Sequence, residues 1–131
     1  MTKRILIVED EADIVSFLER GLAQSGFTTI SCENGALALQ ILEASHADNE
    51  IHLILSDIQM PVMDGIALAL NVARDMPHIP LILMTGYAQQ RERAIGLEQL
   101  VVDIVEKPFE LTHLIGIINQ HIGITNQNID G

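Results

Sequence analysis

The sequence predicts an α/β fold in which five parallel strands form one doubly wound sheet. Four short, continuous apolar runs are typical of strands that are buried on both faces. Between these runs, apolar residues recur at the spacing of one helix face. The two patterns alternate along the chain, and regular alternation of strands and helices produces a parallel sheet covered on both faces. A length of 131 residues gives room for one such domain and no second.

The strands are expected at five places, and the second of them differs from the others. The apolar runs cover residues 5–8, 53–55, 81–84 and 101–105, whereas residues 28–32 mix polar and apolar side chains. A mixed strand suits the edge of a sheet. The strand order 2-1-3-4-5 of a flavodoxin-like (βα)5 fold puts the second strand at an edge. In that order ligands bind between the first and third strands, beyond their carboxyl ends.

The first three helices are expected where helical spacing meets a start or stop signal. Asn34-Gly35 opens a helix over residues 36–44. Asp64 is well placed to cap a helix that runs from residue 65 to about residue 76. The first helix is expected to end at Gly26, and its apolar stripe consists of Ile14, Phe17, Leu18 and Leu22.

The last two helices complete the alternation. The fourth is expected to carry Arg91 and Arg93 on a solvated face. The fifth ends at Gly123, and its apolar stripe consists of Leu111, Leu114, Ile115, Ile118 and Ile122. We therefore expect the domain to cover residues 1–123, with residues 124–131 as a polar tail or the start of a linker.

Composition excludes several classes of function. The formal net charge of −11 argues against direct binding to nucleic acid, which needs a basic surface. The apolar runs are too short to cross a bilayer, and the first residues do not form a secretory signal. The single cysteine, Cys32, suits a reducing compartment. We expect a cytoplasmic protein without direct contact with membranes.

Polar residues gather at the predicted carboxyl ends of the strands. Glu9 and Asp10 follow the first strand, and Asp57 follows the third. A single aspartate at a strand end is more often a helix cap or a loop residue, but three carboxylates together repel one another unless a cation intervenes. Oxygen ligands with access to water suit Mg²⁺. Thr85 closes the fourth strand and Lys107 follows the fifth, so both are expected at the rim formed by the carboxyl ends of the strands. There they offer a hydroxyl and a point charge for phosphate oxygens. This set of groups can form an aspartyl phosphate.

The sequence resembles the receiver domains of two-component response regulators, the CheY-like proteins. The resemblance covers residues 4–122, and five motifs in the right order make it specific. These motifs are Glu9-Asp10, Asp57 with Met60-Pro61, Met63-Asp64-Gly65, Thr85-Gly86 and Lys107-Pro108-Phe109.

The resemblance implies a phosphoryl-accepting switch. Asp57 would take a phosphoryl group from a phosphohistidine on a sensor histidine kinase or a histidine phosphotransfer protein. Asp10 and Asp57 would bind Mg²⁺, for which Mn²⁺ can substitute, together with the backbone carbonyl of Gln59, and Glu9 would act through water. The resemblance leaves the downstream partner or output domain open.

The resemblance also assigns the phosphoryl contacts. Thr85 and Lys107 would bind the phosphoryl oxygens, and the peptide bond between Lys107 and Pro108 would be cis, a geometry that costs little before proline. The position three residues before the lysine, often aromatic in this family, is Ile104. The signal is therefore expected to leave by backbone shifts or another side chain, and Ile104 with Ile117 is one candidate apolar docking patch.

Two positions are expected to set how long the phosphoryl group lasts. Gln59 and Tyr87 lie two residues beyond Asp57 and Thr85, and in receivers these positions flank the approach of the hydrolytic water. Tyr87 is expected to exclude water and give a long-lived phosphoryl group; the alternative is that it points to solvent and docks a partner. Gln59 either orients a water molecule or fills its place.

Two other functions are weighed against the switch. A Mg²⁺-dependent phosphatase or phosphotransferase with an aspartyl intermediate would need a second acid two residues after the nucleophile, where the chain has Gln59, and a cap domain. A nonreactive interaction module with this fold would be expected to lose Asp57, Asp10 or Lys107, and all three are present. The switch is favoured, so the protein is expected to catalyse only its own phosphorylation and slow dephosphorylation.

Overall fold

The computed structural model describes residues 2–45, 47–86, 96 and 99–123. Three predictions fall outside these described residues. They concern the fourth helix with Arg91 and Arg93, the side chain of Tyr87, and the tail over residues 124–131.

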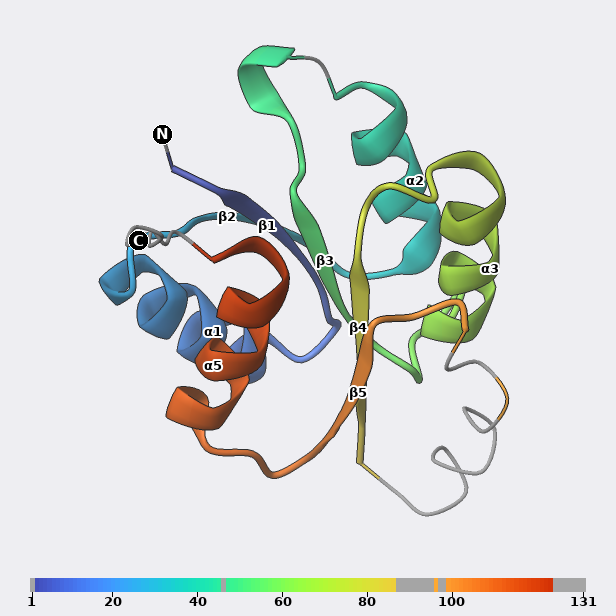
Figure 1. The fold of residues 1–131 in the computed structure, drawn as a ribbon. Helices are drawn as coiled ribbons and strands as arrows, with labels where there is room; N and C mark the ends of the chain where they lie inside the picture. Colours follow the sequence, from blue (N-terminus) through green and yellow to red (C-terminus); the bar gives the residue numbers. More distant parts are fainter. Residues whose placement is uncertain (1, 46, 87–95, 97–98, 124–131) are drawn as a thin grey trace.

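Five parallel strands form the sheet in the order β2-β1-β3-β4-β5, which confirms the predicted fold class. Figure 1 shows β3 at the centre between β1 and β4, with β2 and β5 at the two edges. Because β1, β3 and β4 have neighbours on both sides, their residues are almost entirely buried, as the apolar runs predicted. The strands are β1 (Arg4–Val8), β2 (Thr28–Cys32), β3 (Leu53–Asp57), β4 (Leu81–Thr85) and β5 (Asp103–Glu106).

The fifth strand is shorter than predicted. It begins at Asp103, whereas the apolar run had placed its start at residue 101. Val101 lies before the strand and is nevertheless buried, because it packs against the apolar cluster on one face of the sheet. The backbone N–H of Val102 donates to the carbonyl oxygen of Leu81 at 3.0 Å, which holds this segment beside β4. The apolar run therefore predicted the burial of Val101 and Val105, but Val102 is 40% exposed and the strand begins two residues after the run does.

The helices lie on both faces of the sheet. Figure 1 shows α1 and α5 together on one face and α2 and α3 together on the other. The predicted cap at Asp64 is confirmed, because its side chain accepts a hydrogen bond from Ala67 N at 2.9 Å. Asn34, at the predicted start of the second helix, also caps it by accepting a hydrogen bond from Leu37 N at 2.9 Å. The elements are α1 (Ala12–Gln24), α2 (Gly35–Glu43), the short 3₁₀ helix η1 (Ala47–Asn49), α3 (Gly65–Asp75) and α5 (Leu111–Ile122).

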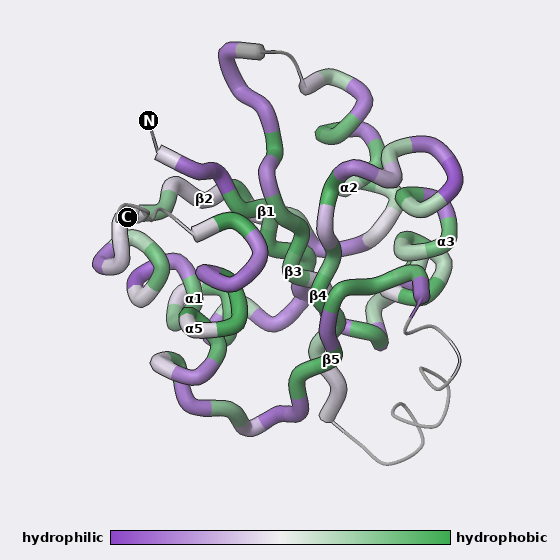
Figure 2. Tube along the Cα trace, viewed as in Figure 1, coloured by the Kyte–Doolittle hydropathy of each residue, from purple (hydrophilic) through white to green (hydrophobic). Residues whose placement is uncertain are grey.

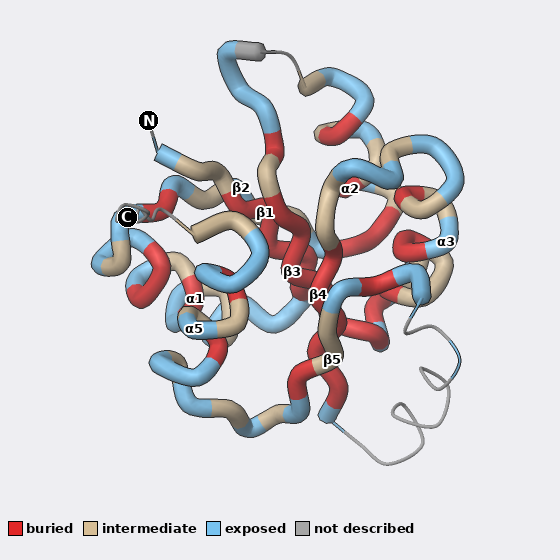
Figure 3. The backbone as a smooth tube through the Cα atoms, in the orientation of Figure 1, coloured by how far each residue is buried: buried red, intermediate tan, exposed pale blue. Residues whose placement is uncertain are grey.

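Two apolar clusters form the core, one on each face of the sheet. Figures 2 and 3 show the hydrophobic, buried strands between the two helical layers. The first cluster includes Leu6, Ile54 and Leu83 and packs against α2 and α3. The second includes Ile7 and Leu55 and packs against α1 and α5. Alternate residues of a strand point to opposite faces, so β1, β3 and β4 each supply both clusters.

One predicted core residue of α1 is wrong. Leu18 and Leu22 are fully buried, but Phe17 is 48% exposed. Leu18 and Leu22 are four residues apart and share one helix face, whereas Phe17 directly precedes Leu18 and points to a different side of the helix. Phe17 instead lines the cavity at the carboxyl ends of the strands. None of the described helices combines the length and apolarity needed to span a membrane.

Candidate functional site

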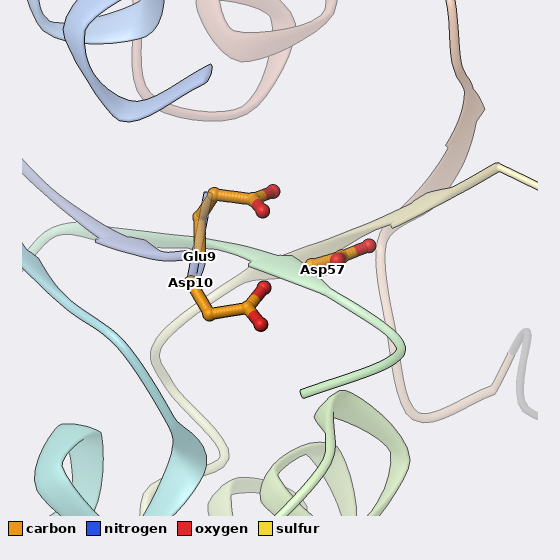
Figure 4. A group of neighbouring side chains, drawn as sticks. All are labelled: Glu9, Asp10 and Asp57. Carbon is orange, nitrogen blue, oxygen red and sulfur yellow. The ribbon is translucent and has the colours of Figure 1, made fainter. Parts of the chain in front are cut away.

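Three carboxylates meet at the carboxyl ends of β1 and β3. Glu9 and Asp10 directly follow β1, and Asp57 is the last residue of β3. Figure 4 shows the three side chains side by side, and each offers an oxygen within 4.8 Å of the others. The sheet order produces this cluster, because β1 and β3 are parallel neighbours whose carboxyl ends share one edge.

Without a cation, the burial of two carboxylates and the repulsion among all three lower the stability of the fold. Glu9 is 2% exposed and Asp57 is 7% exposed, whereas Asp10 is open to solvent. Burial raises the pKa of Glu9, and the neighbouring Asp57 raises it further. Burial also raises the pKa of Asp57, although Lys107 opposes this effect. Two buried carboxylates beside an exposed one form an oxygen-rich site with one open side, which is the kind of site that suits a hard divalent cation.

Lys107 forms the positive part of the site. Its Nζ lies 3.1 Å from Glu9 Oε1 and 3.3 Å from Asp57 Oδ1, so one ammonium group pairs with two carboxylates. Burial alone would lower the pKa of Lys107, but the charges of Asp57 and Glu9 outweigh burial and raise it. The lysine therefore stays charged beside the carboxylates.

The backbone around Lys107 connects it to the end of β4. The N–H of Lys107 donates to the carbonyl oxygen of Thr85 at 2.7 Å, and Thr85 is buried. The peptide bond between Lys107 and Pro108 is cis, as the family resemblance implied. Thr85 and Lys107 thus lie at the rim where the sequence placed them.

A cavity of about 770 Å³ opens beside the carboxylates. Gln59 is exposed and lines this cavity together with Asp10, Asp57 and Lys107. The apolar part of its lining consists of Ile14, Phe17, Pro108 and Phe109. The sequence had predicted Ile14 and Phe17 as part of an apolar helix stripe, and Pro108 and Phe109 as part of a family motif, but none of the four as the lining of a cavity. A phenylalanine at the rim of a predicted core stripe was the available signal.

Ile104 and Ile117, the candidate apolar docking patch, are both half-buried. Ile104 of the edge strand β5 packs against the cluster beneath α2 and α3, whereas Ile117 of α5 packs against the cluster beneath α1 and α5. A shared docking patch of the two side chains stays a prediction.

Ser56, a buried residue next to Asp57, has no role among the sequence-based predictions. Its hydroxyl donates to the carbonyl oxygen of Asp57 at 2.8 Å, and the N–H of Ile58 donates to Asp57 Oδ1 at 3.0 Å. The available signal was a hydroxyl within an otherwise apolar strand, directly before the candidate nucleophile.

Comparison with known proteins gives a family match over most of the chain. The family model described as "Response regulator receiver domain" matches residues 5–119. A solved structure, the signal receiver domain of a signal transduction histidine kinase from Syntrophus aciditrophicus, is 28% identical with a TM-score of 0.81 and covers 99% of this chain and 98% of its own. A CheY-like receiver domain protein from Methanospirillum hungatei is 26% identical with a TM-score of 0.81, covering 92% of this chain and 93% of its own.

Two curated relatives are transcriptional regulators that are longer than this chain. The DNA-binding transcriptional regulator NtrC of Escherichia coli is 33% identical over 90% of this chain and 24% of its own length. The transcriptional regulatory protein PrrA of Mycobacterium tuberculosis is 34% identical over 86% of this chain and 46% of its own length. The chain therefore spans less than half the length of these relatives.

Proposed function

Because the chain belongs to the response regulator receiver domain family, we propose that it is a phosphoryl-accepting signalling switch. Asp57 takes the phosphoryl group, and the change at this site alters which partner the protein binds. The observation that carries the proposal is the position of Asp57, beside two further carboxylates and 3.3 Å from the ammonium group of Lys107. A nucleophile, oxygen ligands for a cation and a positive charge for phosphoryl oxygens thereby share one edge of the sheet.

The donor is a phosphohistidine on a sensor histidine kinase or a histidine phosphotransfer protein. A carboxylate oxygen of Asp57 attacks the phosphorus atom, and the bond between phosphorus and the imidazole nitrogen breaks with its electrons left on the imidazole. Lys107, which pairs with Glu9 and Asp57 before transfer, then binds oxygens of the new phosphoryl group. Thr85, at the end of β4 beside β3, supplies its hydroxyl to the same group.

The metal that fits this site is Mg²⁺, with Mn²⁺ as a substitute. Asp10, Asp57 and the backbone carbonyl of Gln59 would hold the ion directly, and Glu9 would act through water. The fit rests on the three clustered carboxylates, two of which are buried, and on the exposed side that Asp10 provides. When bound, the ion neutralises negative charge on the transferring group.

Phosphorylation by a small donor tests the acceptor. With Mg²⁺ and acetyl phosphate, the wild-type protein should gain a single base-labile acyl phosphate, measured by intact-protein mass spectrometry. Asp57→Asn should gain none, because an amide is a poor nucleophile. Modification of the Asn variant, or an unmodified wild type, would overturn the assignment of Asp57.

Thermal unfolding tests the metal site separately. Mg²⁺ should raise the melting temperature of the wild type, because a ligand that binds only the folded state stabilises it. Asp10→Ala should remove this effect. The matched control is Asp13→Ala, which removes another exposed aspartate, in the first turn of α1 and outside the carboxylate cluster. Equal Mg²⁺ stabilisation of the Asp10 and Asp13 variants would show that the cation binds elsewhere.

The wider setting follows from the same family. We place the protein in the cytoplasm, where kinase donors are available and the thiol of Cys32 stays reduced. The relatives named above are transcriptional regulators, so we propose an output through a further domain or a separate partner. We do not propose direct contact with DNA, because this domain is acidic. The phosphatase alternative gains no support, because Gln59 occupies the place where such an enzyme needs an acid.

A further inference from the structure

Ser56 places a hydroxyl inside an apolar layer at the centre of the sheet. The residue is fully buried in β3, and its neighbours across the sheet are Val8 of β1 and Leu83 of β4. Both neighbours belong to the apolar cluster beneath α2 and α3. A buried hydroxyl costs free energy unless it finds a hydrogen-bond partner. The partner of Ser56 therefore indicates what the hydroxyl does.

That partner is the peptide group that joins Asp57 to Ile58. Ser56 Oγ donates to the carbonyl oxygen of this group at 2.8 Å. The N–H of the same group donates to Asp57 Oδ1 at 3.0 Å and to the carbonyl oxygen of Met84 at 3.1 Å. A peptide group is planar, so its carbonyl and its N–H turn together. The orientation that satisfies Ser56 is thus also the one that directs the N–H at the carboxylate.

The start of α3 packs over this peptide group from another direction. A Cβ atom on Gly65 would collide with the carbonyl oxygen of Asp57. Gly65 N donates to the carbonyl oxygen of Ile58 at 2.8 Å, which fixes the helix start to the same segment. The peptide group after Asp57 therefore accepts a hydrogen bond from Ser56 at its oxygen, and the backbone of Gly65 packs closely against it.

We propose that Ser56 is a positioning residue for phosphoryl transfer, which acts on the Asp57 carboxylate through the intervening peptide group. The inference rests on the proposed function and adds a residue to it. Asp57 Oδ1 is the atom that also faces Lys107 at 3.3 Å. Loss of the Ser56 hydrogen bond removes one of the restraints on the peptide group, which weakens the bond from Ile58 N–H and lets the carboxylate leave the orientation in which it reacts.

Ser56→Ala tests the proposal, because it deletes the hydroxyl and adds no bulk. The rate of phosphorylation at saturating acetyl phosphate and Mg²⁺ should fall by about fivefold, the equivalent of one neutral hydrogen bond. The donor concentration at half-maximal rate and the Mg²⁺ concentration at half-maximal stabilisation should not change. The free energy of unfolding should change little, because the apolar layer loses a polar group while the carbonyl oxygen of Asp57 loses a hydrogen-bond donor.

Two further variants separate positioning from a structural role. Ser56→Thr keeps the hydroxyl and should restore most of the rate. Ser31→Ala is the matched control, because it removes a strand hydroxyl from β2 beside Ile7, and it should leave the rate unchanged.

The outcomes distinguish this inference from the proposed function. A wild-type rate in Ser56→Ala overturns the positioning role and leaves the acceptor role of Asp57 intact. A loss of stability in Ser56→Ala that matches the loss of rate, without rescue by Ser56→Thr, also overturns positioning. A wild-type protein that takes up no phosphoryl group refutes the proposed function, and the positioning role falls with it.

Discussion

Val62 occupies a backbone conformation that should cost the protein stability. Its φ is 70°, a value that is unusual for any residue with a side chain and most unfavourable for a β-branched one. Met63 N donates to the carbonyl oxygen of Pro61 at 2.8 Å, which closes a tight γ-turn around Val62. The turn is fixed to α2, because Gly35 N donates to the carbonyl oxygen of Met63 at 2.9 Å.

Val62→Gly should therefore stabilise the fold. Removing the Cβ atom relieves a steric cost of about 1–2 kcal/mol. Glycine also gives the unfolded chain more conformational freedom, which lowers the free energy of unfolding by about 0.5–1 kcal/mol. The valine side chain is 84% exposed, so its loss removes only about 0.3 kcal/mol of apolar burial. The net expected gain in the free energy of unfolding is about 0.5 kcal/mol, or a rise of about 2 °C in melting temperature.

Urea unfolding of three proteins measures this effect. Val62→Ala is the control, because it removes the branched methyl groups but retains the Cβ atom and so retains most of the strain. We expect the glycine variant to unfold at the highest urea concentration, with the slope of the transition unchanged. If the alanine variant equals or exceeds the glycine variant in stability, the positive φ of Val62 is not a source of strain.

Two further predictions follow from hydrogen bonds and charge. Burial raises the pKa of Asp57 above its usual 3.8, so the stability linked to this group is complete below that pH and is lost as pH rises through the raised value. Without Mg²⁺, Asp57→Asn should therefore unfold at higher urea than the wild type at pH 7, with the gap closing near pH 4, and a less stable variant at pH 7 would contradict the sign. At the opposite end of the sheet, Arg4 N donates to His52 Nδ1 at 2.9 Å. His52→Ala should lower the free energy of unfolding by about 1 kcal/mol, and His52→Asn, which keeps an acceptor, should lose less; equal losses would show that the bond contributes nothing.

The sequence by itself determined the order of the elements and the location of the acidic cluster. Continuous apolar runs indicate burial on both faces, and the mixed run at residues 28–32 indicated the edge strand. Once the strand order is known, parallel strands bring their carboxyl ends to one edge, so Glu9 and Asp57 must come together. Local signals also worked where the chemistry is local, as at Asn34 and Asp64, whose side chains cap the helices that follow them.

Only the tertiary structure decided what each buried or half-buried side chain contacts. Helical spacing placed Phe17 in the core, but the face of α1 that meets the sheet is centred on Leu18 and Leu22, and Phe17 lines the cavity. An apolar pattern indicates that a segment buries surface, but it does not indicate which neighbouring element covers that surface. The partner of the Ser56 hydroxyl depends likewise on the backbone path where β3 ends, and on the close approach of α3 that Gly65 permits. Such contacts join residues through three-dimensional packing, which has no periodic signature in the sequence.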